Sequence, residues 1–142
     1  MSAIPRRFTP LQRGLHWLMA ACILAMLFIG VGMVSTIAPK YLPLISIHKT
    51  LGVAILLLAL ARLAVRWRYG APALPADLPA SMKVAAELSH YALYGLTIAM
   101  PLLGWGMLSA ASEPVVLFGG LRLAMILPPS DSVHTLLRNA HI

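Results

Sequence analysis

Four histidines lie near the ends of long apolar segments, at His16, His48, His90 and His134. An imidazole inside such a segment is costly unless it has a partner, and neutral imidazole is a good ligand for iron. The carboxylates and thiolates that usually complete zinc or copper sites are absent from this pattern. The histidines are therefore candidate ligands of haem iron, with a proton relay through hydrogen-bonded imidazoles as the alternative interpretation.

The composition indicates that these histidines belong to a membrane protein. Of 142 residues, 60% are hydrophobic and 11% are charged, whereas a soluble domain carries about 25% charged residues. Mean hydropathy is +0.85. The net charge of +7 comes from arginines and lysines that cluster at the ends of the apolar segments. This clustering favours orientation in a membrane over nucleic-acid binding, so no nucleic-acid partner is expected.

The order of apolar segments and connections predicts an all-α fold, a transmembrane four-helix bundle that forms one domain over residues 1–142. Each long segment can cross a hydrocarbon core of roughly 30 Å at about 1.5 Å per residue. The first exceeds the apolar region of a cleavable signal peptide, which is about 7–15 residues long. We expect helices at about 11–34, 44–69, 82–109 and 131–142, the fourth cut short by the end of the chain.

Two connections and one proline complete this prediction. The proline-rich stretch 70–80 should be an extended surface link. The apolar stretch 115–129, broken by glycines, is too short to cross and should form an interfacial loop or short helix. Pro101 is a candidate kink in the third helix.

The basic residues beside the apolar segments predict the orientation. Six flank the end that holds the N-terminus and three flank the other: Arg6, Arg7, Arg13, Arg66, Arg68 and Lys83 against Lys40, Lys49 and Arg122. This bias places the N-terminus in the cytoplasm. The histidines then sort by depth into a cytoplasmic pair, His16 with His90, and an outer pair, His48 with His134. His141 shares the helix face of His134 but falls near mid-membrane, and we do not count it among the ligands.

Residues near the histidines could complete a haem site. Gly52 lies one turn beyond His48 and would leave room for haem, although helix packing is the more common role of such a glycine. Haem propionates need cations. The candidates are Arg13, Arg62 and Arg66 on one side and Lys49 and Arg122 on the other. The more common role of such arginines is as topology determinants.

Four segments, in this order, resemble the prokaryotic cytochrome b561 family over nearly all of residues 8–142. They are LQRGLHWLMA around His16, ISIHKTLGVAILLLALARLAVRW around His48, LSHYALYGLTIAMPLLGWGM around His90, and VHTLL from Val133. The resemblance implies a four-helix bundle in the bacterial inner membrane, with two b-type haems that exchange electrons with ubiquinone.

The resemblance also implies ligand roles. His48 and His134 match the ligands of the outer haem, and His16 matches one ligand of the inner haem. The family has a further histidine about four turns beyond the position of His134, which here falls past Ile142. His90 would either ligate the inner haem instead or contact quinone or a propionate.

The expected function is one-electron transfer between haem and ubiquinone. Some relatives are superoxide oxidases, so oxidation of superoxide on the periplasmic side is a further expectation, and whether the chain is itself an oxidoreductase stays open. The alternatives are a cytochrome b subunit of a larger dehydrogenase, and a haem-free membrane transporter or assembly protein with a histidine proton relay. The expected partners are the lipid bilayer, quinone and a soluble or periplasmic electron donor, and a homodimer is left open.

Overall fold

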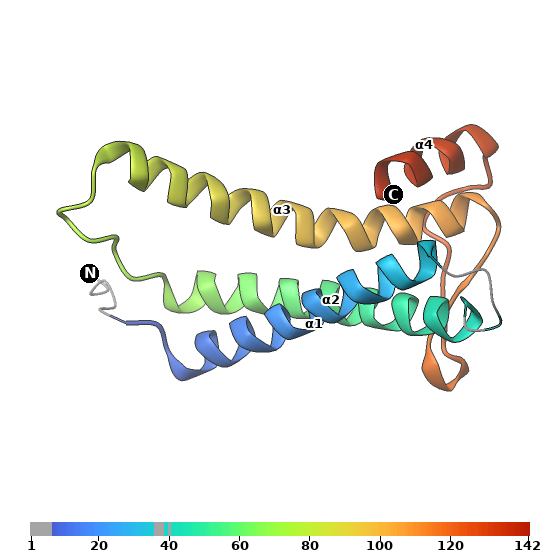
Figure 1. Ribbon diagram of the computed structural model, residues 1–142, viewed down its shortest axis with the longest axis horizontal. Helices are drawn as coiled ribbons and strands as arrows, with labels where there is room; N and C mark the ends of the chain where they lie inside the picture. Colours follow the sequence, from blue (N-terminus) through green and yellow to red (C-terminus); the bar gives the residue numbers. More distant parts are fainter. Residues whose placement is uncertain (1–6, 36–38, 40) are drawn as a thin grey trace.

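The computed structural model describes residues 7–35, 39 and 41–142, and in these ranges helices dominate (Figure 1). The helices are α1 (Pro10–Val34), α2 (Tyr41–Tyr69), α3 (Ala80–Ala110) and α4 (Asp131–His141). Between α3 and α4 lie the two-residue strands β1 (Val115–Val116) and β2 (Arg122–Leu123), which pair antiparallel around the 3-10 turn η1 (Phe118–Gly120). The four-helix prediction is confirmed. Arg6 and Lys40, used above to predict orientation, lie outside the described residues.

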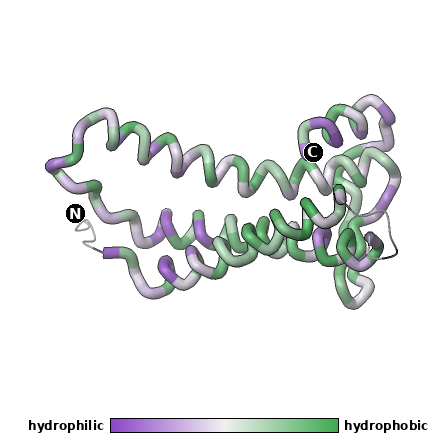
Figure 2. The backbone as a smooth tube through the Cα atoms, in the orientation of Figure 1, coloured by the Kyte–Doolittle hydropathy of each residue, from purple (hydrophilic) through white to green (hydrophobic). Residues whose placement is uncertain are grey.

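Three of the helices are long and apolar enough to cross a membrane, namely α1, α2 and α3, with mean hydropathies of 2.4, 2.0 and 1.4 over their most apolar stretches. Large apolar side chains on their outer faces are exposed, such as Phe28 at 78% and Leu57 at 62%. These side chains would face lipid, where exposing them carries no hydrophobic penalty. Hydrophilic residues gather at the N-terminal end of α1 and the C-terminal end of α2 (Figure 2).

One hydrogen bond ties the start of α1 to the end of α2. Thr9 and Gln12 form a capping box, in which each side chain accepts a hydrogen bond from the other residue's backbone N–H. The Gln12 amide then donates to the carbonyl oxygen of Gly70 at 2.8 Å. Gly70 has φ of 73°, a left-handed conformation that suits glycine just past a helix end. This contact fixes one end of the helix pair.

The connection between α3 and α4 (residues 111–130) covers the opposite end of the bundle, and we call this end of the bundle the hairpin end. The Ser109 hydroxyl accepts from the Ile126 N–H at 3.1 Å, and the Trp105 indole N–H donates to the Ala124 carbonyl at 3.0 Å. The Phe118 N–H donates to the Thr50 hydroxyl of α2 at 3.2 Å. The stretch 115–129 was expected to form an interfacial loop or short helix. It contains a small hairpin with a 3-10 turn, and hydrogen bonds hold it against α2 and α3.

The helices pack in chain order, α1 on α2, α2 on α3 and α3 on α4. α3 continues through Pro101 as one helix. Its contact with α4 depends on small residues, because a Cβ at Gly106 would come within 3.1 Å of a Leu137 methyl and 3.2 Å of a Leu127 methyl. The Ser130 side chain caps α4 by accepting a hydrogen bond from the Val133 N–H.

Candidate functional site

Two histidines of α4 are held by α3 in the same way. The Nδ1 of His134 lies 3.0 Å from the carbonyl oxygen of Met107, and the Nδ1 of His141 lies 3.0 Å from that of Met100. A carbonyl oxygen only accepts hydrogen bonds, so each Nδ1 carries the proton and, in a neutral ring, each Nε2 is left bare. A backbone carbonyl commonly orients metal-binding histidines in this manner.

A third histidine, His48 on α2, lies beside His141. The rings of His48 and His141 meet edge to face, with centroids 6.0 Å apart and planes at 80°. The Nδ1 of His48 is buried, with no hydrogen-bond partner among the described residues. A buried polar nitrogen without a partner is costly. The His48 ring therefore has a polar nitrogen left for a further partner.

His48 and His141 are thus neighbours at this end of the bundle, with 6.0 Å between their ring centroids. His134, the predicted partner of His48, lies seven residues before His141 along α4, a rise of about 10 Å. The pairing of His48 with His134 stays a prediction.

Two arginines gather at the other end of the bundle, which we call the arginine end (Arg62 and Arg66 of α2). Their guanidinium carbons lie 5.5 Å and 5.9 Å from the ring centroid of Tyr94 on α3. The Arg62 Nη1 also lies 3.5 Å from the Met19 sulfur of α1. These partners use few of the five N–H donors of each guanidinium. Donors therefore remain for an anionic or carbonyl group.

The predicted cytochrome ligands on α1 and α3 lie toward this same end. His16 is exposed and its ring meets that of Trp17, with centroids 5.5 Å apart. His90 is exposed one turn before Tyr94. α1 and α3 each pack against α2. The pairing of His16 with His90 also stays a prediction.

The glycines near the histidines differ in what they face. A Cβ on Gly52 would meet the Met26 side chain of α1 at 3.6 Å, which is ordinary packing distance, so Gly52 faces the α1–α2 contact. A Cβ on Gly104 would come within 3.0 Å of the His141 ring. Gly104 thus makes room for His141, and sequence reasoning missed it. The available signal was a glycine inside a long apolar helix, which is typical of close helix packing.

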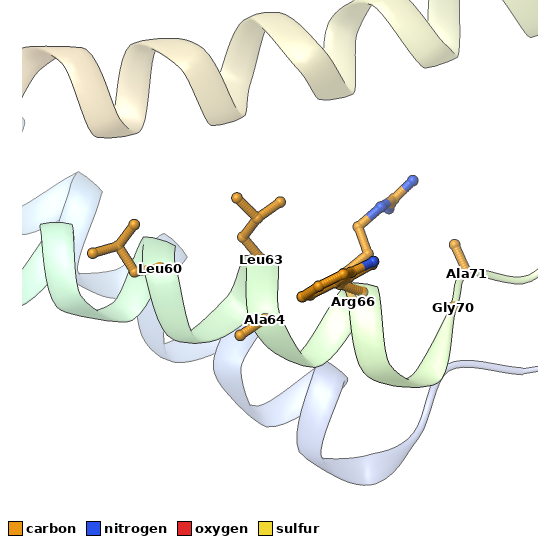
Figure 3. Close-up of a pocket in the computed structure, with 7 residues that line it drawn as sticks. Leu60, Leu63, Ala64, Arg66, Gly70 and Ala71 are labelled. Carbon is orange, nitrogen blue, oxygen red and sulfur yellow. The ribbon is translucent and has the colours of Figure 1, made fainter.

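A cleft of about 740 Å³ lies along the C-terminal part of α2 (Figure 3). Its lining is apolar apart from Arg66 and the Trp67 indole N–H: Leu60, Leu63, Ala64, Arg66, Trp67, Gly70 and Ala71. Leu63 and Arg66 project from α2 on the same side, toward the neighbouring helix in Figure 3. The cleft can therefore accept an apolar chain with a polar head near a guanidinium.

Comparison with known proteins agrees with this architecture. A family model described as prokaryotic cytochrome b561 matches residues 7–142. The chain is 28% identical to "Cytochrome b561 homolog 1" of Escherichia coli (strain K12) over 143 positions, covering 95% of this chain and 77% of that protein. It is 29% identical to "Probable superoxide oxidase CybB" of Yersinia pestis over 134 positions, which cover 91% of this chain and 70% of that protein. It is 30% identical to "Cytochrome b561 homolog 2" of Escherichia coli (strain K12), over a stretch that covers 81% of this chain and 62% of that protein.

Proposed function

This chain belongs to the prokaryotic cytochrome b561 family, and from this premise we propose that it transfers single electrons between haem and ubiquinone. Its family and its three apolar helices make it a multi-pass bacterial membrane protein, a b-type cytochrome of electron transfer. We further propose that residues 1–142 act as one domain, with the N-terminus in the cytoplasm.

At the hairpin end, the proposed haem ligands are His48 of α2 and His134 of α4. The hydrogen bond from His134 Nδ1 to the Met107 carbonyl supports this assignment, because it leaves Nε2 free for iron. The partnerless, buried nitrogen of His48 also supports it. Bound haem supplies the one-electron redox chemistry, while the protein sets access and orientation.

At the arginine end, His16 and His90 are the proposed residues of the second haem, with His90 as ligand or quinone contact. Arg62 is the proposed partner of a propionate. Its partial burial and free N–H donors support this role, because charge-assisted hydrogen bonds to guanidinium are strong. Gly52 is proposed either to leave room for haem or to pack helices, and its contact with Met26 supports the second role.

The cleft on α2 is the proposed ubiquinone site. Leu60, Leu63 and Ala64 offer an apolar surface for the isoprenoid chain, and the Arg66 guanidinium can donate a hydrogen bond to a quinone carbonyl. Two electrons and two protons convert the quinone to the quinol. The position of the cleft beside the arginine end supports electron delivery from the haem proposed there.

Superoxide is the proposed electron donor, oxidised at the periplasmic face. It would lose one electron to haem and leave as dioxygen. A relative carries the name of a probable superoxide oxidase. Lys49 and Arg122 lie at the hairpin end, where positive charge raises the local concentration of an anion.

The observation that carries this proposal is the set of imidazoles at the hairpin end, within a chain of this family. The test is purification after haem-replete expression, followed by optical spectroscopy and an assay of ubiquinone reduction by superoxide. We expect a low-spin b-type spectrum, and a His48→Ala variant that lacks one haem. A protein without bound haem, or a His48→Ala variant with full haem content, would contradict the proposal.

A further inference from the structure

The hairpin between α3 and α4 turns one face to the bundle and the other outward. Val115 is 4% exposed and the next residue, Val116, is 36% exposed, because neighbouring side chains of a strand point to opposite faces. The turn of this hairpin (residues 117–121), which we call the hairpin tip, carries Phe118 and Leu121, each 61% exposed. Large apolar side chains held in water are unfavourable, and an exposed apolar patch can mark a contact with a protein or a membrane.

The backbone of the hairpin tip is fixed by hydrogen bonds and by one special conformation. Gly119 has φ of 82°, a left-handed conformation that glycine adopts without strain. The Leu117 N–H donates to the Leu121 carbonyl at 2.9 Å and closes the turn. The Phe118 N–H donates to the Thr50 hydroxyl of α2 at 3.2 Å. The fold therefore holds the apolar tip in a defined place beside α2.

The residue that holds the tip, Thr50, indicates its level in the membrane. α2 has 29 residues, which span about 43 Å, so it is longer than a hydrocarbon core of roughly 30 Å. Lys49 directly precedes Thr50. A lysine at the end of a membrane span keeps its ammonium among the lipid head groups. Thr50 therefore lies near the boundary between head groups and hydrocarbon.

The hairpin reaches this boundary from the side of the bundle. β1 contacts both α2 and α3, and η1 contacts α2. In Figure 1 the hairpin, in orange, extends across α2 and away from α3, roughly perpendicular to the long axis that the three candidate spans follow. Leu57 lies two turns beyond Thr50 on the same face of α2 and is 62% exposed. The face of α2 that carries the tip is therefore a lipid-facing one.

We propose that the hairpin tip is an interfacial anchor, whose Phe118 and Leu121 side chains insert among phospholipids of the leaflet at the hairpin end. They contact the part of the acyl chains next to the glycerol. Phe and Leu are among the side chains with which interfacial segments enter this layer. Through Thr50, the anchor restrains α2 two residues from His48. The inference needs no bound haem, so it holds or fails independently of the proposed electron transfer.

The first experiment measures the depth of the tip with a fluorescent label in lipid nanodiscs. Cys22 is the only cysteine of the chain, so Cys22→Ser gives a background in which Leu121→Cys takes a single bimane label. The lipids are phosphatidylcholines, either plain or brominated near the glycerol end of their acyl chains, because bromine quenches a fluorophore on contact. We expect the labelled tip to lose fluorescence in the brominated lipid. Equal fluorescence in the two lipids would overturn the proposal.

Two further labelled positions calibrate this measurement. Leu57→Cys lies on the exposed apolar face of α2 and should be quenched most by lipids brominated near the middle of their chains. Glu113→Cys, exposed in the same connection as the tip, should be quenched by neither lipid. Aqueous iodide tests the other possible occupants. A label on Leu121→Cys shielded from both iodide and brominated lipid would show that a protein covers the tip, which would contradict a lipid anchor.

The second experiment changes the tip itself. Leu121→Asp places a carboxylate at the edge of the hydrocarbon, where a charge is costly. We expect faster amide exchange at Phe118 in nanodiscs, because the tip then leaves the lipid and its hydrogen bond to Thr50 opens more often. Leu121→Phe is the matched control, since it keeps an apolar side chain and should leave this exchange unchanged. The same exchange rate in both variants would contradict the anchor.

Discussion

The guanidinium carbon of Arg62 lies 5.5 Å from the ring centroid of Tyr94, and this contact joins α2 to α3 at the arginine end. Arg66, one turn further along α2, lies 5.9 Å from the same ring. Tyr94 thus holds both cations of the arginine end in place. His90 lies one turn before Tyr94 on α3. The orientation of the proposed quinone and propionate partners therefore depends on one aromatic side chain.

Replacing Tyr94 by Leu should destabilise the α2–α3 contact. Each cation–π interaction contributes about 0.5–1 kcal/mol at partly exposed sites, so a loss of about 1–2 kcal/mol is expected. The measurement is thermal unfolding in detergent. Tyr94→Phe keeps the ring face and should retain most of the stability, and equal destabilisation by Phe and Leu would show that the hydroxyl, not the ring face, matters.

Replacing Arg66 by Gln should raise the KM for a short-chain ubiquinone and leave the haem spectrum unchanged. The reason is that Arg66 contributes the cation of the cleft. The control is Arg68→Gln on the same helix, whose guanidinium lies 5.6 Å from the ring centroid of Tyr69 and does not line the cleft. A shift in KM of the same size in both variants would assign the effect to net charge.

Replacing Gln12 by Ala should loosen the start of α1 from the end of α2. The variant loses the hydrogen bond to the Gly70 carbonyl and one half of the capping box. A hydrogen bond contributes about 0.5–1.5 kcal/mol net, so a decrease of about 1–3 kcal/mol in the free energy of unfolding is expected. The check is denaturant titration in mixed micelles. The Gln12→Glu variant keeps the acceptor for the Thr9 N–H and removes only the amide donor. Its free energy of unfolding should therefore decrease less than that of Gln12→Ala.

Replacing Ser109 by Ala should detach the connection 111–130 from α3. The Ser109 hydroxyl is almost fully buried at 1% exposure and is the acceptor for the Ile126 N–H. An N–H left without a partner costs about 1–3 kcal/mol. Faster amide exchange at Ile126 is the expected result. Ser89→Ala is the control, because its exposed hydroxyl bonds only within α3, and unchanged exchange in Ser109→Ala would contradict this role.

The sequence predicted the helices well because each depends on a local pattern. The apolar length of α1, α2 and α3 and the cap at Ser130 are visible in the chain itself. The contact of His48 with His141 was not predicted, because counting residues gives depth along a helix but not the tilt of α4 against α2. The role of Gly104 depends on that same tilt. The hydrogen bond from Gln12 to Gly70 joins residues 58 positions apart, and no local pattern marks it.

The matched spacing of the two carbonyl anchors on α3 limits how this bundle can evolve. Inserting one residue between Met100 and Met107 would rotate one anchor by about 100° relative to the other. One imidazole would then lose its acceptor whatever position α4 took. Changes of length in this stretch are tolerable only if α4 changes by the same number of residues, so the two helices must keep a common register.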